Sequence, residues 1–71
     1  MGSVSEILND PKAGAQELAE AVSRDPTLRN LVLRMANSAY YRRRERVHDV
    51  TRAVILIGFT GISQLLRSIR L

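Results

Sequence analysis

Residues 40–46 carry the most chemistry in this 71-residue chain, because two tyrosines are followed by four arginines within five positions. Guanidinium groups pair with phosphates and a tyrosine ring stacks on a base, so this segment has the groups that contact nucleic acid or another anion. Arg34 and Tyr41 are expected to share one face of the preceding helix. The candidate anion-binding residues are Arg34, Tyr41, Arg42, Arg43, Arg44 and Arg46. A solvated loop, with Glu45 and Asp49 nearby, is the ordinary alternative.

The only histidine, His48, precedes Asp49, and this pair invites comparison with metal-dependent phosphohydrolases. One imidazole and one carboxylate fall short of the three or four protein ligands of a usual metal site. The chain has no cysteine and no Gly-x-Ser-x-Gly segment, which leaves no thiol or serine nucleophile of a familiar kind. We therefore expect no catalytic residue, no metal and no cofactor, and a protein that is not an enzyme.

Charge is divided unevenly along the chain, whose net charge is +4. Up to Asp25 there are two basic and five acidic residues, a balance of −3, and the remainder has nine basic and two acidic residues, a balance of +7. The second part can meet an anionic partner, or the two parts can attract one another between subunits.

Apolar residues recur at helical spacing in four places. The four stripes are Val4, Ile7 and Leu8; Ala15, Leu18, Ala19 and Val22; Leu28, Leu31, Val32, Met35, Ala36 and Ala39; and Ile62, Leu65, Leu66 and Ile69. We expect an all-α protein, a compact bundle of four to five short helices.

Local signals set the expected helix boundaries. Asp25-Pro26 is a strong start, since Asp caps free amides and Pro suits the first helical position. Asp49 is expected to cap a helix that runs through residue 57, with Gly58 ending it and Thr60 capping the last helix. Residues 54–57 are all apolar and mostly β-branched, which also suits a strand, but a single strand would have no partner, so we expect a helix there.

The longest apolar run, residues 53–59, is far shorter than the ~20 residues that cross a bilayer as a helix, so we expect no contact with a membrane. The lack of cysteine fits a reducing compartment, and we expect a cytoplasmic protein.

Several segments together resemble the amino-terminal part of the HD-related output domain (HDOD) family. They are residues 7–11 (ILNDP), 17–19 (ELA), 24–28 (RDPTL), 33–41 (LRMANSAYY), Val47 and 53–58 (AVILIG). The resemblance implies an all-helical module of bacterial signalling and regulatory proteins, related to HD phosphohydrolases but without their metal ligands. It also implies a non-catalytic scaffold for interactions.

The chain departs from the family pattern in two ways. Arginines follow the tyrosine pair where the family usually has a glycine-containing turn, and the larger carboxy-terminal helical part is absent. We expect residues 1–3 to be a cloning remnant and residues 4–71 to form a single, truncated module. The faces that the missing part would cover favour self-association. The candidate residues for it are Ile62, Leu65, Leu66 and Ile69.

Three functions follow from these patterns. The first is a non-catalytic regulatory module that binds protein and forms a homodimer through its last two helices. The alternative is a small DNA- or RNA-binding protein that uses the arginine cluster. The third is recognition of a cyclic dinucleotide or another phosphorylated signal by residues 42–46, because guanidinium groups match phosphate geometry.

Overall fold

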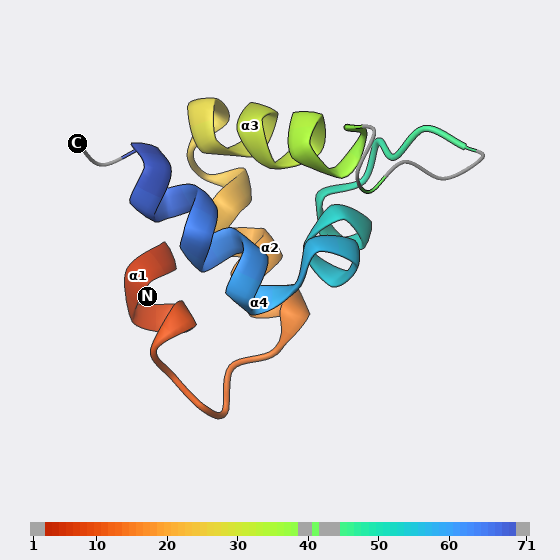
Figure 1. Ribbon diagram of the computed structural model, residues 1–71. Coiled ribbons are helices and arrows are strands. Elements are labelled where there is room, and N and C mark those ends of the chain that lie inside the picture. Colours follow the sequence, from red (N-terminus) through yellow and green to blue (C-terminus); the bar gives the residue numbers. More distant parts are fainter. Residues whose placement is uncertain (1–2, 39–40, 42–44, 70–71) are drawn as a thin grey trace.

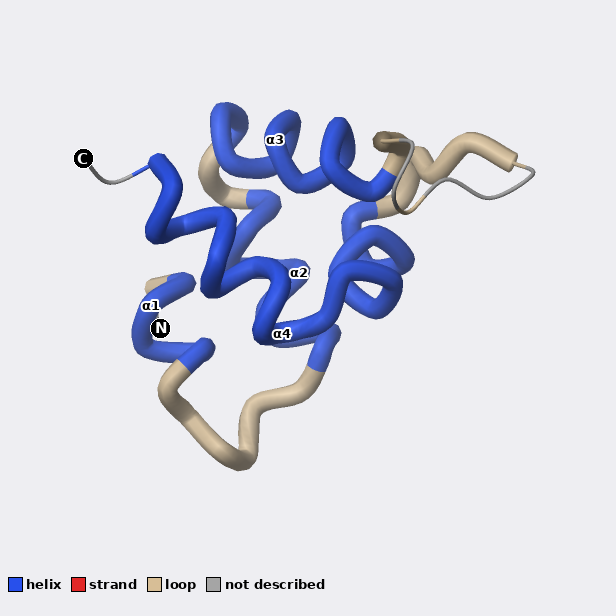
Figure 2. The backbone as a smooth tube through the Cα atoms, in the orientation of Figure 1, coloured by secondary structure: helices blue, strands red, loops and turns tan. Residues whose placement is uncertain are grey.

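A computed structural model describes residues 3–38, 41 and 45–69 of the chain. Within these residues there are four helices: α1 (Val4–Leu8), α2 (Ala15–Ser23), α3 (Pro26–Ala36) and α4 (Val50–Ile69) (Figure 1). The described part of the chain contains no strand (Figure 2). The expected all-α bundle of short helices is confirmed.

The start of α3 is the one that the sequence predicts. The Asp25 carboxylate accepts hydrogen bonds from the amides of Thr27 (3.1 Å) and Leu28 (3.2 Å), while Pro26 occupies the first helical position. These contacts satisfy two amides that have no partner within the helix. The helix therefore begins at a defined residue, and the turn from α2 into α3 is short.

A capping box starts α1. The Glu6 amide donates to Ser3 Oγ (3.2 Å) and the Ser3 amide donates to Glu6 Oε1 (2.8 Å), so Ser3, which the sequence assigns to a cloning remnant, takes part in the fold. The amide and then the hydroxyl of Ser3 hold the pKa of Glu6 below its ordinary value of 4.5. The contribution of this carboxylate to the stability of the fold is therefore present at a pH above its ordinary pKa of 4.5. It is lost as the pH falls and the carboxylate is protonated.

Helix α4 is bent at Gly58, whose φ of 83° and ψ of 164° are not helical. We call residues 50–57 the first arm and residues 59–69 the second arm; they run in different directions in Figure 1. The predicted break at Gly58 is confirmed, and residues 54–57 are helical as expected. The predicted cap at Thr60 is wrong, because the helix has already resumed before that residue.

The core lies where both arms of α4 meet α2 and α3. Its fully buried large side chains come from three helices and from both arms: Leu18, Val22, Val32, Val54 and Ile62. Helix α1 adds Ile7 at one edge. Because the bend lets one helix cover two others, a small core closes with few elements.

By length and composition, α4 is the one helix of the described part that is apolar enough to cross a membrane, which the short apolar run did not predict. The bend at Gly58 divides this apolar helix into two short arms. At 1.5 Å per residue the two arms are only about 12 and 16 Å long, against about 30 Å of hydrocarbon in a bilayer. Only 28% of the apolar window is buried in the bundle.

The side chain of Asn37 joins the end of α3 to the segment that leads into α4. Its Nδ2 donates to the carbonyl oxygens of Leu33 (2.9 Å) and Val47 (2.8 Å), and its Oδ1 accepts from the Val47 amide (2.7 Å). One amide thus pairs with both backbone groups of Val47, as a neighbouring strand would. We call these bonds the Asn37 clamp. It joins two residues that lie ten positions apart and so closes the segment between them into a loop.

Replacing Asn37 with Asp tests the clamp, because Asp keeps the size and the acceptor but loses the donor. We expect Asn37→Asp to lower the free energy of unfolding by about 1–3 kcal/mol, since two part-buried carbonyl oxygens lose their partner. The measurement is urea unfolding followed by circular dichroism. Asn30→Asp, at an exposed position of the same helix, is the matched control and should change stability far less. Equal effects at both positions would reject the clamp as a stabilising contact.

Gly58→Ala tests the bend. A Cβ at Gly58 would meet no atom within 4 Å, so any loss comes from the backbone conformation alone. We expect a loss of about 1–3 kcal/mol, because this region of φ and ψ strains every residue with a side chain. Gly14→Ala is the control: its φ of −104° is open to alanine and its Cβ is also unobstructed. The bend is not required if thermal unfolding midpoints of the two variants coincide.

Candidate anion-binding site

Two of the predicted anion-binding residues, Arg34 and Arg46, line one hollow of about 830 Å³. Arg42, Arg43 and Arg44 lie outside the described residues. The described residues that line the hollow are Arg29, Asn30, Leu33, Arg34, Asn37, Arg46, Val47 and His48. We call it the arginine groove. Sequence reasoning missed Arg29 and His48 as members, because nothing local indicates that they lie together.

The groove has two walls from separate parts of the chain. Helical periodicity places Asn30, Leu33, Arg34 and Asn37 along one face of α3, where they form the first wall. The Asn37 clamp holds Val47 against the end of that helix, so the residues on either side of Val47 form the second wall. The groove is thus fixed at the backbone by the same contact that closes the loop.

The electrostatics of the arginine groove favour an anion. Its described lining residues include three arginines and one histidine, and none of them has a carboxylate. The side-chain hydrogen bonds of the described part of the chain do not involve Arg29, Arg34 or Arg46. The donors of these three side chains are therefore available to a charged acceptor, with which guanidinium forms strong paired bonds.

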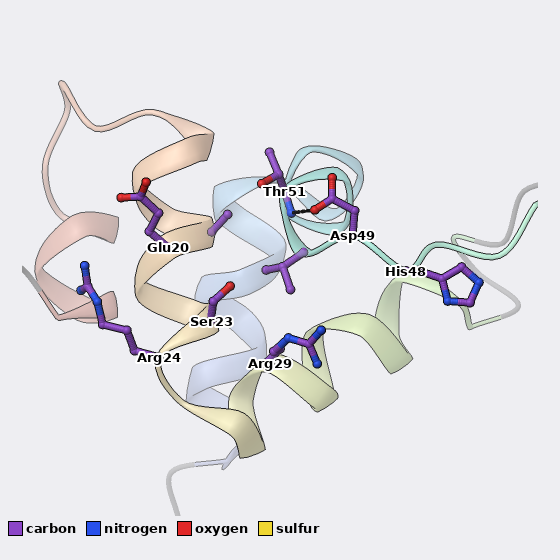
Figure 3. Close-up of a pocket in the computed structure, with 9 residues that line it drawn as sticks. Glu20, Ser23, Arg24, Arg29, His48, Asp49 and Thr51 are labelled. Carbon is purple, nitrogen blue, oxygen red and sulfur yellow. Dashed lines mark hydrogen bonds between the residues drawn. The ribbon is translucent and has the colours of Figure 1, made fainter.

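A second hollow, of about 500 Å³, lies beside the groove and shares Arg29 and His48 with it. It also contains the carboxylates of Glu20 and Asp49 (Figure 3). The Asp49 carboxylate turns toward its own helix and accepts from the Thr51 amide (3.2 Å), whereas the His48 ring points away from it (Figure 3). Asp49 is thus the predicted cap of the first arm of α4.

This arrangement separates the His48-Asp49 pair that the sequence offers as metal chemistry. Among the described residues, no group of three or more His, Cys, Asp or Glu side chains is placed to hold a metal ion. The pair is split because the backbone enters a helix at this point and the cap fixes the carboxylate.

The sequence allows two places for the tyrosines, since one of them is expected to pack against the core while Tyr41 is also a candidate for the face of Arg34. Tyr41 is half-buried and packs against the core rather than continuing the face of Arg34. A Cβ placed on Gly61 of α4 would lie 3.4 Å from the Tyr41 hydroxyl oxygen and 2.5 Å from Ile57 Cγ2. The glycine therefore leaves room chiefly for Ile57 of the first arm, and the tyrosine tip lies at ordinary contact distance beside it. The chain turns after Ser38, whose carbonyl accepts from the Tyr41 amide (3.1 Å), and so α3 does not continue to Tyr41.

The predicted self-association residues do not form an open stripe. Ile62 is fully buried, Leu65 and Leu66 are partly buried against the core, and Ile69 is 47% exposed. The second arm turns this face inward because the bend at Gly58 folds it over α2. The most exposed large apolar side chain of the described part is instead Ile55, at 66%. Sequence periodicity missed it, since residues 54–57 have no polar face.

The sequence was compared with protein-family models, and the chain with curated proteins and solved structures. The family model of the HDOD domain matches residues 1–71. Searches of curated proteins and of solved structures found no match. The helical fold and the split His48-Asp49 pair are in keeping with the resemblance carried by the sequence segments, and the family match spans the whole printed sequence. The chain belongs to the HDOD domain family.

Proposed function

We propose that this HDOD domain is a non-catalytic regulatory module that acts by binding protein, including a second copy of itself. The family makes it a signalling-associated output domain. The proposal adds the mode of action, and its lack of catalysis is in keeping with the separate directions of the His48 and Asp49 side chains (Figure 3). We also propose that it acts in the cytoplasm, which the absence of cysteine from the sequence supports.

The exposure of Ile55 carries the proposal. It lies mid-helix in the first arm of α4, 66% exposed, and a hollow of about 450 Å³ beside it is lined by Val47, Arg52, Ile55 and Leu56. Covering a large aliphatic side chain gains about 1.5–3 kcal/mol, which makes such a residue a natural anchor at a contact between proteins. Arg52, on the same arm, adds a polar rim of the kind that surrounds such anchors.

Size and charge favour a second copy as one partner. A standard interface takes about 800 Å² from each partner, roughly a seventh of the 5293 Å² surface of the described chain. Small domains bury too little surface alone to be very stable, so a second subunit adds what the core lacks. The acidic part of the sequence up to Asp25 and the basic remainder supply opposite charges for two copies.

Light scattering after size exclusion, at tens of micromolar protein, tests self-association. We expect a dimer, and we expect Ile55→Gln to weaken it about tenfold or more, since the apolar anchor is lost. Ile69→Gln makes the same change at the exposed end of the second arm. Comparing the two variants shows which arm of α4 forms the contact. A folded monomer over the whole concentration range contradicts self-association. A larger effect at Ile69 would move the contact to the second arm.

The alternative function, DNA or RNA binding through the arginines, is supported by one observation: Arg34 and Arg46 line the same groove. A labelled duplex titrated at two salt concentrations tests it. Affinity that falls steeply with salt supports the alternative, because phosphate contacts release counterions. No binding at low salt rejects it.

A further inference from the structure

The arginine groove carries an inference that is independent of protein binding. It brings Arg29 and Arg34 of α3 together with Arg46 and His48 of the following segment, although they lie up to 19 positions apart in the sequence. We infer that the groove is a binding site for a small phosphorylated ligand of nucleotide size. Its phosphates would pair with the three guanidinium groups, and its uncharged part would lie on Leu33 and Val47.

The charge of the groove selects the phosphate. The carboxylates of Glu20 and Asp49 line the adjoining hollow and not the groove, and Glu45, next to Arg46 in the sequence, is not among the described lining residues of the groove. Asp49 already accepts a hydrogen bond from the Thr51 amide. An anion in the groove therefore meets positive charge from both walls and no carboxylate among the lining side chains. Arginine presents its donors as a planar fork that matches phosphate oxygens two at a time.

The shape of the groove selects a small ligand. Its volume of about 830 Å³ is enough space for a small molecule, which would lie in a hollow open to solvent on one side. From Arg29 to Asn37 the α3 wall is about 12 Å long, which suits a few phosphates and one ring system. Leu33 and Val47 are half-buried and offer an apolar contact. A nucleic-acid backbone, a ridge of sugars and phosphates, makes little use of such a contact.

The Asn37 clamp keeps the two walls in place before any ligand arrives. Both backbone groups of Val47 are bonded to Asn37, at 2.7 and 2.8 Å, and Arg46 and His48 are its direct neighbours. A ligand that bridges the walls thus orders side chains rather than the backbone, which lowers the entropy lost on binding. Binding to the folded state alone also stabilises the fold.

NMR titration of the full chain, labelled with 15N, tests the site, using ATP without metal and inorganic pyrophosphate as probes. We expect saturable shift changes in the amides of residues 29–37 and 46–48, with ATP binding more tightly than pyrophosphate because of the apolar contact. Equal affinities, or shifts spread over all helices, would overturn the assignment of a nucleotide-sized ligand to this groove.

Substitutions of single arginines identify the contacts. We expect Arg34→Gln and Arg46→Gln each to raise the Kd for ATP about tenfold, as for the loss of a charged hydrogen bond. Arg67→Gln removes the same charge from the exposed second arm, outside the groove, and should change the Kd by less than about twofold. Circular dichroism confirms that each variant is folded. Arg46 lies outside the helices, so its variant answers the question even if Arg34→Gln unfolds.

Two results would overturn the inference. One is an equal loss of ATP affinity in Arg67→Gln, which would show attraction to net charge alone. The other is a short labelled duplex that binds more tightly than ATP and loses affinity with the same groove variants, which would make the ligand a nucleic acid.

Discussion

The hydrogen bonds between Asn37 and Val47 fix the two walls of the arginine groove relative to each other. A side-chain amide replaces a neighbouring strand: it donates to one carbonyl, accepts from one amide, and also bonds back to Leu33 in its own helix. In an all-helical protein the backbone between helices has no ladder to join, and part-buried polar groups still need partners. A single asparagine at the end of α3 meets this need and sets where the chain re-enters the bundle toward α4.

The second constraint is the bend at Gly58. A straight helix of 20 residues would be about 30 Å long, nearly the full 33 Å of the longest dimension of the bundle, and could not fold back on itself. With the bend, Val54 of the first arm and Ile62 of the second arm are both buried in the same core. Gly61 leaves room for Ile57 of the first arm, because a Cβ at Gly61 would lie 2.5 Å from Ile57 Cγ2. The two glycines, three positions apart, have different roles. Gly58 adopts a backbone conformation that other residues rarely reach, and Gly61 lacks the side chain that would collide with its neighbour.

Features set by nearest neighbours were predictable from the sequence, and features set by distant contacts were not. Asp25-Pro26 and Gly58 act on their own backbone, so the helix start and the break could be read directly. The place of Tyr41 stayed open and Ile62 was misplaced, because their surroundings depend on how α4 folds back. The arginine groove was half predicted: Arg34 and Arg46 were named, whereas Arg29, on α3 with Arg34, and His48, placed with Arg46 by the Asn37 clamp, were not.

The clamp has a consequence for how such a domain can change over time. Residues 38–46 enter and leave between Asn37 and Val47, which are bonded to each other through Val47's backbone and the Asn37 side chain. Substituting Val47 keeps those backbone partners, and the segment's interior is not part of the bond. Apart from Tyr41, which packs against the core, the composition of this segment can therefore change without removing a bond of the clamp. A change of surface between Asn37 and Val47 thus leaves the contact that joins α3 to the start of α4 in place.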